Sequence, residues 1–188
     1  MEAIEILERE HDVARIVVDA ACREADRIQM TGKVNPDEIE HIVDFLHFFA
    51  DTCHDPKEEE LLFARLNTCG SGCLSGPVAA LYRDHESLRA ILDSVSDSLA
   101  RAEAGDRVAI MPLALNLKSY VELMREHMHK EEESIFPLAQ SYLSAVDRSK
   151  LALEFDAVEP DEAEAAIHEH YYLMALDMIQ YARDEPKL

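Results

Sequence analysis

Two stretches of the chain repeat one arrangement of histidine and acidic residues. The first is HDPKEEELLFA, beginning at His54, and the second is HMHKEEESIFP, beginning at His127. In both, a glutamate follows the histidine by four residues, at Glu58 and Glu131. Residues four apart lie on one face of a helix, about 6 Å along its axis. Each stretch therefore presents an imidazole nitrogen and a carboxylate in the same direction, a donor set that suits iron, manganese or zinc.

A second pair of stretches precedes these two at matching distances. LEREHDVARIVVD (7–19) aligns with LYRDHESLRAILD (81–93) at an offset of 74 residues, and the two HxxKEEE stretches align at an offset of 73. The alignment pairs His11 with His85, each at an apolar-face position of its predicted helix. We therefore predict two halves related by a pseudo-two-fold axis, each of which supplies half of one site.

Helical periodicity and loop signals place these motifs on four long helices. Apolar residues recur at spacings of three and four, while a glycine near residue 32, the segment NTCGSGCLSGP and the segment EAGD interrupt the pattern. Short connections between long helices imply antiparallel neighbours. The sequence predicts an all-α, up-down four-helix bundle over residues 1–145, with a C-terminal helical extension over 146–188 that packs on it. The expected helices are about 4–28, 35–66, 77–104 and 108–141, followed by a short one near 149–155 and a final one near 160–182.

In such a bundle, six side chains would meet in the interior. They are four histidines and two glutamates: His11, His54, His85, His127, Glu58 and Glu131. Burying two carboxylates without cations would cost several kcal/mol each, and metal ions remove that cost. Two bridging glutamates suit two metals about 3.5–4 Å apart. The alternative is His–Glu pairs on solvated helix faces, worth a few tenths of a kcal/mol, but the repetition of the motif with a partner histidine argues against it.

A count of coordination positions indicates what such a site would do. Two octahedral ions offer about twelve positions. Two bridging carboxylates, one bridging oxygen and four histidines leave about two of these positions for water or a small ligand. Open positions indicate a reactive site, whereas closed sites are structural.

The order of these residues, H…HxxxE…H…HxxxE, resembles the hemerythrin-like, or HHE cation-binding, domain family over about residues 1–140. The tail HEHYYLMAL is also similar to tails in that group. The resemblance implies a four-helix bundle with an oxo- or hydroxo-bridged pair of iron ions, for which zinc or manganese could substitute. The four histidines would then be terminal ligands, and Glu58 and Glu131 the bridges.

The resemblance also implies a function, with alternatives that stay open. One is binding of, or response to, O2, NO or reactive oxygen and nitrogen species, with a separate redox or signalling protein as partner. Another is an enzyme-like role in repairing damaged iron centres or in removing peroxide or NO, and a third is a structural or storage metal site. Oxygen-carrying members have a histidine four residues after the one that matches His85, where this chain has Arg89. The missing histidine argues against simple reversible oxygen carriage.

Several neighbours of the predicted ligands carry weaker expectations. His47 and Tyr120 occupy matched positions seven residues before His54 and His127, either as supporting or additional ligands or as ordinary core residues. Pro56 and Pro137 are expected to disturb their helices. Cys69 and Cys73 are either a redox pair or, more in keeping with a loop, two free thiols. The remaining acids of the repeated motifs are expected on solvated faces, or in one case as the support of a ligand: Glu59, Glu60, Glu132 and Glu133. Lys57 and Lys130 are expected to balance local charge.

Composition limits the classes of partner and the compartment. The formal net charge is −21, which argues against binding nucleic acid or an anionic membrane surface. No apolar run approaches the roughly 20 residues of a membrane-spanning helix, and the first residues, MEAIEILERE, are charged and helix-forming. Four cysteines are too few for a disulfide framework. The sequence therefore predicts a cytoplasmic protein with reduced thiols.

Overall fold

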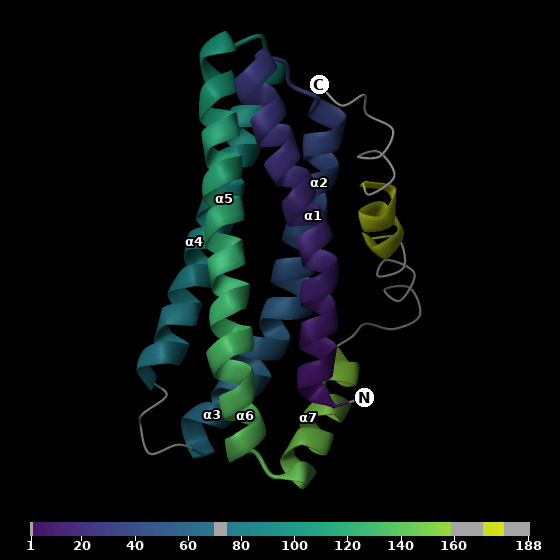
Figure 1. The fold of residues 1–188 in the computed structure, drawn as a ribbon, viewed down its shortest axis with the longest axis vertical. Helices are drawn as coiled ribbons and strands as arrows, with labels where there is room; N and C mark the ends of the chain where they lie inside the picture. Colours follow the sequence, from purple (N-terminus) through teal and green to yellow (C-terminus); the bar gives the residue numbers. More distant parts are fainter. Residues whose placement is uncertain (1, 70–74, 159–170, 179–188) are drawn as a thin grey trace.

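The computed structural model describes residues 2–69, 75–158 and 171–178, and the regular structure of these residues is entirely helical (Figure 1). This confirms the all-α prediction. The elements are α1 (Ala3–Thr31), α2 (Pro36–Phe48), η1 (Phe49–His54), η2 (Lys57–Leu62), α3 (Phe63–Cys69), α4 (Ser75–Glu103), η3 (Arg107–Ala109), α5 (Ile110–Lys130), η4 (Glu131–Ile135), α6 (Phe136–Tyr142) and α7 (Ala145–Val158).

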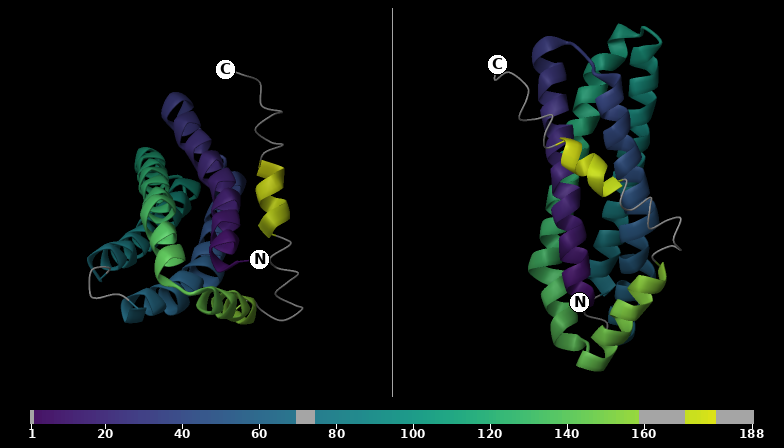
Figure 2. Two further views of the ribbon diagram at one scale, coloured as in Figure 1. Left: turned by 60° about the horizontal axis from the view of Figure 1, so that its bottom comes forward. Right: turned by 90° about the vertical axis from the view of Figure 1, so that its right-hand side faces the viewer.

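Most of these elements make four long segments that stand side by side along their length (Figure 1). In chain order the segments are α1, then α2 to α3 with η1 and η2, then α4, and then α5 to α6 with η4. α1 packs against α5 and α2, and α4 packs against the same two helices from the other side. α7 packs against α1 and η2 at one end. Residues 171–178 form a helical turn, yellow in Figure 2, that crosses α1 and α2. There Tyr171 stacks on Phe48 at a ring distance of 4.2 Å.

Local sequence signals explain where the first long helices end and begin. Gly32 adopts a φ of 65°, and its N–H donates to the carbonyl of Ile28 at 2.8 Å, closing the last turn of α1. Pro36 then starts α2, since its missing N–H needs no partner there. Before α5, the Asp106 carboxylate accepts a bond from the N–H of Val108 at 3.0 Å. These breaks lie where the glycine and proline signals predict them.

The second and fourth segments switch to π-helix where the predicted ligands lie. The N–H groups of Asp55, Phe63 and Phe136 bond to carbonyls five residues back, rather than four. Pro56 lies between η1 and η2, and Pro137 lies in the first turn of α6, so both prolines predicted to disturb a helix border a π turn. Each π turn holds an extra residue, which rotates later side chains by about 100° around the axis.

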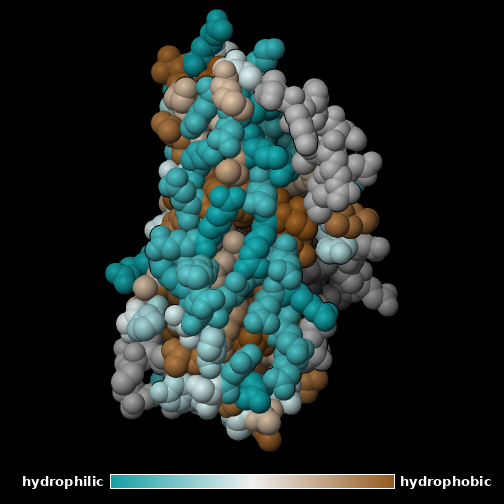
Figure 3. Space-filling view, viewed as in Figure 1, coloured by the Kyte–Doolittle hydropathy of each residue, from teal (hydrophilic) through white to brown (hydrophobic). Residues whose placement is uncertain are grey.

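The apolar interior forms two clusters, one on each side of the predicted ligands. The larger one is built mainly from α1, α2, α4 and α5. The smaller one joins the start of α1 to η2, α3, the start of α4, η4, α6 and α7. Along α1, Leu7 belongs to the smaller cluster and Ala14 to the larger, with His11 between them. The face in Figure 3 is mostly hydrophilic. Among the described helices, none is long and apolar enough to cross a membrane.

Candidate metal centre

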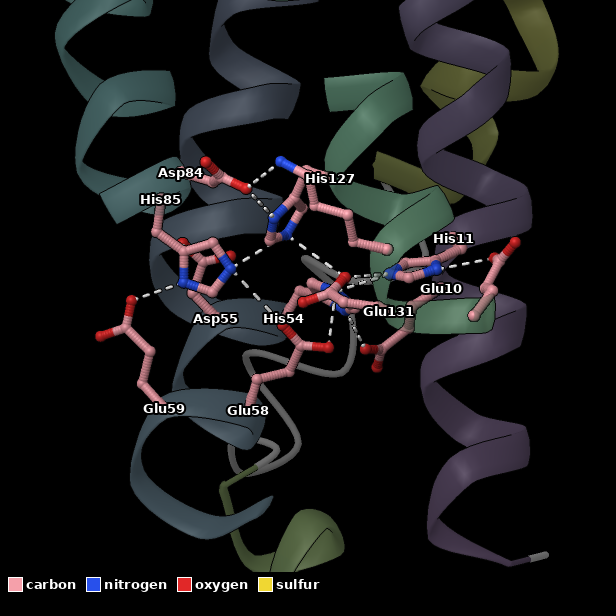
Figure 4. Close-up of polar contacts among 12 residues, drawn as sticks. Glu10, His11, His54, Asp55, Glu58, Glu59, Asp84, His85, His127 and Glu131 are labelled. Carbon is pink, nitrogen blue, oxygen red and sulfur yellow. Dashed lines mark hydrogen bonds and ion pairs between the residues drawn. The ribbon is translucent and has the colours of Figure 1, made fainter. Parts of the chain in front are cut away.

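Between the two apolar clusters, the predicted ligands converge from four helical segments (Figure 4). Their donor atoms form two groups, and the atoms of each group lie within 4.8 Å of one another. Glu58 and Glu131 belong to both groups, and all six side chains are buried. The first group adds His11 and His54, and the second adds His85 and His127.

The inner nitrogens of each histidine pair face each other at short range. Nε2 of His11 lies 3.1 Å from Nε2 of His54, and Nε2 of His85 lies 3.0 Å from Nε2 of His127. Distances from these nitrogens to the shared carboxylates are 3.2–3.6 Å. Ligand atoms about 2.1 Å from one ion lie about 3.0 Å apart at a right angle and about 3.4 Å apart at the tetrahedral angle. The spacings therefore fit an ion within each group.

The two shared carboxylates provide a separate test of this fit. All four oxygens of Glu58 and Glu131 are buried without a hydrogen-bond partner among the described residues. Burial, reinforced by the charge of Glu58, raises the pKa of Glu131 well above its usual value. Two adjacent buried carboxylates cannot both stay ionised unless a positive charge lies between them. The donor set thus fits metal cations, since these supply that charge.

An outer set of carboxylates orients the histidine rings. The Nδ1 of His11 donates to Glu132 at 2.8 Å, that of His54 to Glu10 at 2.8 Å, and that of His85 to Glu59 at 2.7 Å. For His127 the corresponding carboxylate is Asp84, but at 3.8 Å it makes no hydrogen bond, so this ring is not held as the other three are. A proton on Nδ1 leaves the Nε2 lone pair free to bind a metal, so these carboxylates hold the tautomer that a ligand needs. These carboxylates also follow the sequence repeat. Glu10 matches Asp84 at the offset of 74 residues, and Glu59 matches Glu132 at the offset of 73.

A cation is paired with each outer carboxylate. Lys57 bonds to Glu10 and Arg15 bonds to Glu132, while Lys130 lies 3.0 Å from Asp84 and Arg89 lies 3.1 Å from Glu59. The outer carboxylates are therefore balanced by side chains of the protein. Arg89 is shared, because it also lies 2.6 Å from the buried Asp55, whereas the carboxylates of Glu58 and Glu131 have no hydrogen-bond partner among the described residues.

Comparison with known families gives a match to the hemerythrin HHE cation binding domain over residues 2–139. The chain belongs to the hemerythrin HHE family. The matched region contains both donor groups, and domains of this family bind metal cations.

Curated relatives of this hemerythrin-family chain are distant. Uncharacterized proteins of Mycobacterium tuberculosis (strain H37Rv) and Mycobacterium bovis are each 25% identical over 157 residues, which is 84% of this chain and 61% of the relative. The iron-sulfur cluster repair protein YtfE of Dickeya chrysanthemi is 24% identical over 140 residues, covering 72% of this chain and 63% of that protein. The chain thus spans less than two thirds of the length of these relatives. No solved structure matches it.

The two weaker candidates differ in position. Tyr120 is buried on α5 and lines a small cavity together with His85 and His127. His47 is half-buried at the end of α2, and it belongs to none of the three groups of possible metal donors found in the described residues. The π-helical η1 separates His47 from His54, whereas regular α-helix joins Tyr120 to His127. The added rotation explains why these matched positions face differently.

Some residues of the site were missed or placed wrongly by the sequence interpretation. Glu10 and Asp84 escaped notice, although each directly precedes a predicted ligand in matched positions of the repeat. Glu59 and Glu132 are half-buried and bonded to histidines, so ligand support, expected for one of these acids at most, is found for two of them. Lys57 is fully buried. Cys73, with the side chain of Cys69, lies outside the described residues, so the expectation for that pair stays a prediction.

Proposed function

We propose that the protein holds two iron ions between its four helical segments. His11 and His54 would bind one ion, His85 and His127 would bind the other, and Glu58 and Glu131 would bridge them. The single observation that carries this proposal is the pair of shared glutamates, whose four buried oxygens have no hydrogen-bond partner among the described residues. Zinc or manganese would fit the same donors, because imidazole and carboxylate accept all three metals.

We also propose the architecture expected from the sequence: an antiparallel four-helix bundle with an internal two-fold repeat, ending near residue 145, and a C-terminal extension over 146–188. The matched outer pairs support the repeat. His11–Glu132 corresponds to His85–Glu59, and His54–Glu10 corresponds to His127–Asp84. Three of the four histidine rings are therefore hydrogen-bonded to a carboxylate from another segment, and His127 faces Asp84 of another segment at 3.8 Å, so that the site depends on the packing of all four.

The function we propose is binding of, or response to, a small molecule such as O2, NO or a reactive oxygen or nitrogen species. Bound iron would supply redox change and open coordination positions. The residues of the chain keep the histidine nitrogens directed inward, balance the outer charge and bury the site between apolar clusters. The similarity to a protein named for iron-sulfur cluster repair favours a second candidate, in which this chain acts in the repair of iron centres.

A metal count combined with an absorption spectrum tests the proposal. We expect about two irons per chain and near-ultraviolet bands that change when NO or O2 is added. His127→Ala should lower the iron content and weaken the bands. Equal iron in both proteins would contradict the ligand assignment. Zinc in both positions after expression without added iron, with no redox response once iron is supplied, would leave only a structural or storage role.

Three measurements separate gas binding, repair of iron centres and detoxifying catalysis. Reversible spectral change with gas, without loss of iron, supports binding or sensing. Transfer of iron to a metal-free cluster protein supports the repair role. Multiple turnover of peroxide or NO with an added reductant would instead support a detoxifying enzyme.

A further inference from the structure

The two halves of the candidate site differ in their access from outside. A cavity of about 10 Å³ lies beside His85 and His127, between α2 and α4. Its size is close to the room needed for one water molecule. Tyr120, Leu88 and Leu92 form part of its wall. His11 and His54 do not line it. Small molecules in this cavity would therefore meet only one of the two histidine pairs.

An ion pair lies at the outer end of the cavity. Arg89, whose side chain is 36% exposed, reaches over to Asp55 at 2.6 Å and to Glu59 at 3.1 Å. Asp55 itself is buried at the cavity wall. Figure 4 shows Asp55 and Glu59 on the same side of the site as His85. The cavity thus has a charged mouth and a mostly apolar wall.

The other half carries different side chains at the matched positions. The repeat pairs Asp55 with Met128, which is buried, and pairs Ala50, a small residue of the cavity wall, with Leu123. A surface hollow on that side is lined by Arg15, Met128 and Glu132, and it includes neither His11 nor His54. Other matched positions carry smaller side chains there, Ala14 for Leu88 and Val18 for Leu92, so the difference in access rests on the cavity itself, which is lined by His85 and His127 and by neither His11 nor His54.

Aromatic rings add to the closure of the other half. Phe136 stacks on His11 at a ring distance of 5.5 Å, and Phe49 stacks on His54 at 5.3 Å. In the accessible half, Phe63 stacks on His85 at 6.2 Å. His127 also has the longest distance to its outer carboxylate of the four histidines. The accessible half is thus also the less tightly held one.

We propose that small uncharged molecules reach the site between α2 and α4, at the His85/His127 half, and that the Asp55–Arg89 ion pair closes this route. The inference rests on the proposed function and adds to it the direction of entry and the class of ligand. The cavity admits molecules of about diatomic size. Its apolar wall favours uncharged ones, because a charge would lose its hydration there.

The first test is the rate at which nitric oxide associates with the iron-loaded protein, followed by stopped-flow absorption. Ala50→Leu places in the cavity wall the side chain that the other half has at the matched position. It should slow association by about tenfold, since entry rates among variants of one protein vary over 1–3 decades. Iron content should stay the same. An unchanged rate in a fully loaded variant would overturn the proposed route.

A pair of matched arginine substitutions tests whether the Asp55–Arg89 ion pair closes the cavity. Arg89→Gln removes the bonds to Asp55 and Glu59, while Arg15→Gln removes the corresponding bond to Glu132 in the other half. A change in the association rate that is the same in both variants would come from weaker positioning of the histidine rings, because each arginine bonds to a carboxylate that holds one of them. Faster association confined to Arg89→Gln supports the ion pair as the closing element, and equal rates in the two variants contradict it.

A second measurement needs no iron, so it separates this inference from the proposed function. Dissolved O2 is an uncharged paramagnetic probe, and it speeds the NMR relaxation of methyl groups that it can reach. In the protein loaded with diamagnetic zinc in place of iron, methyl groups of Leu88, Leu92 and Met124 should relax faster than those of Val18, the buried residue of α1 that matches Leu92 in the other half, and Ala50→Leu should remove the difference. Equal relaxation of the methyl groups of all four residues would refute the proposed route even if iron and NO bind. An absent NO response with unequal relaxation would instead refute the function and keep the route.

Discussion

Lys57 provides the sharpest test of how the outer charges hold the site. Its side chain is fully buried and bonds to Glu10, which in turn bonds to His54. The matched residue Lys130 makes the same kind of contact with Asp84 at 3.0 Å, but its side chain is 38% exposed. The same substitution at both positions, Lys57→Met and Lys130→Met, therefore removes the same kind of ion pair, once from a buried position and once from an exposed one.

The expected magnitudes follow from that burial. Removing one partner of a buried ion pair costs about 3–5 kcal/mol. We expect the lower end, about 3 kcal/mol, because Glu10 keeps 15% of its side chain exposed and retains its bond to His54. An exposed pair contributes about 0–1 kcal/mol. In a chain of this size each kcal/mol shifts Tm by about 2–4 °C, so Lys57→Met should lose about 6–12 °C and Lys130→Met at most about 4 °C.

The assay is unfolding by heat and by urea, on wild type and both variants at the same metal content. Added salt should weaken the contribution of Lys130 and leave that of Lys57 nearly unchanged, because exposed charges are screened and buried ones much less so. Equal losses in the two variants would refute the argument that burial decides the energetic role of these matched lysines.

Three further outcomes are expected. Glu132→Gln should weaken metal affinity by about 10–100-fold, measured by competition with a chelator, because a neutral amide no longer favours the ligand tautomer of the histidine ring that it contacts; affinity equal to wild type would contradict the orienting role. Phe136→Ala should destabilise the protein by about 3–5 kcal/mol in urea unfolding, and a loss below about 1 kcal/mol would contradict its core position. His47→Ala should leave the iron content near that of wild type, whereas His54→Ala should reduce it, and equal reductions would show that His47 is a ligand.

Much of the inner site could be predicted because its residues repeat at fixed spacing. His11 and His85 stand out only when the two halves are aligned, since a single histidine on an apolar helix face gives no signal by itself. The same alignment contains the outer carboxylates: Glu10 and Asp84 precede these histidines directly. They were missed because charged residues on helices are usually solvated, and sequence shows no contact between segments.

Other features lie beyond sequence reasoning for a physical reason. The matched positions of His47 and Tyr120 predict equal orientation on ideal helices, where seven residues make about two turns. The π turns in the second segment break that equality, and they arise from the balance of backbone bonds and packing around Pro56. The burial of Lys57 against the exposure of Lys130 likewise depends on which helices cover each half.

The division of the apolar interior into two clusters affects how the protein unfolds. The clusters are separated at the level of His11 by the predicted ligands and their outer carboxylates, here called the polar belt. Neither cluster therefore continues through the full length of the four segments. With cations in place, the polar belt ties all four segments together, at a level in the N-terminal half of α1. Without them, the two inner glutamates cannot both stay ionised, and the polar belt leaves buried polar groups without partners between the two apolar clusters. Metal occupancy would then decide whether the two ends melt together or one after the other.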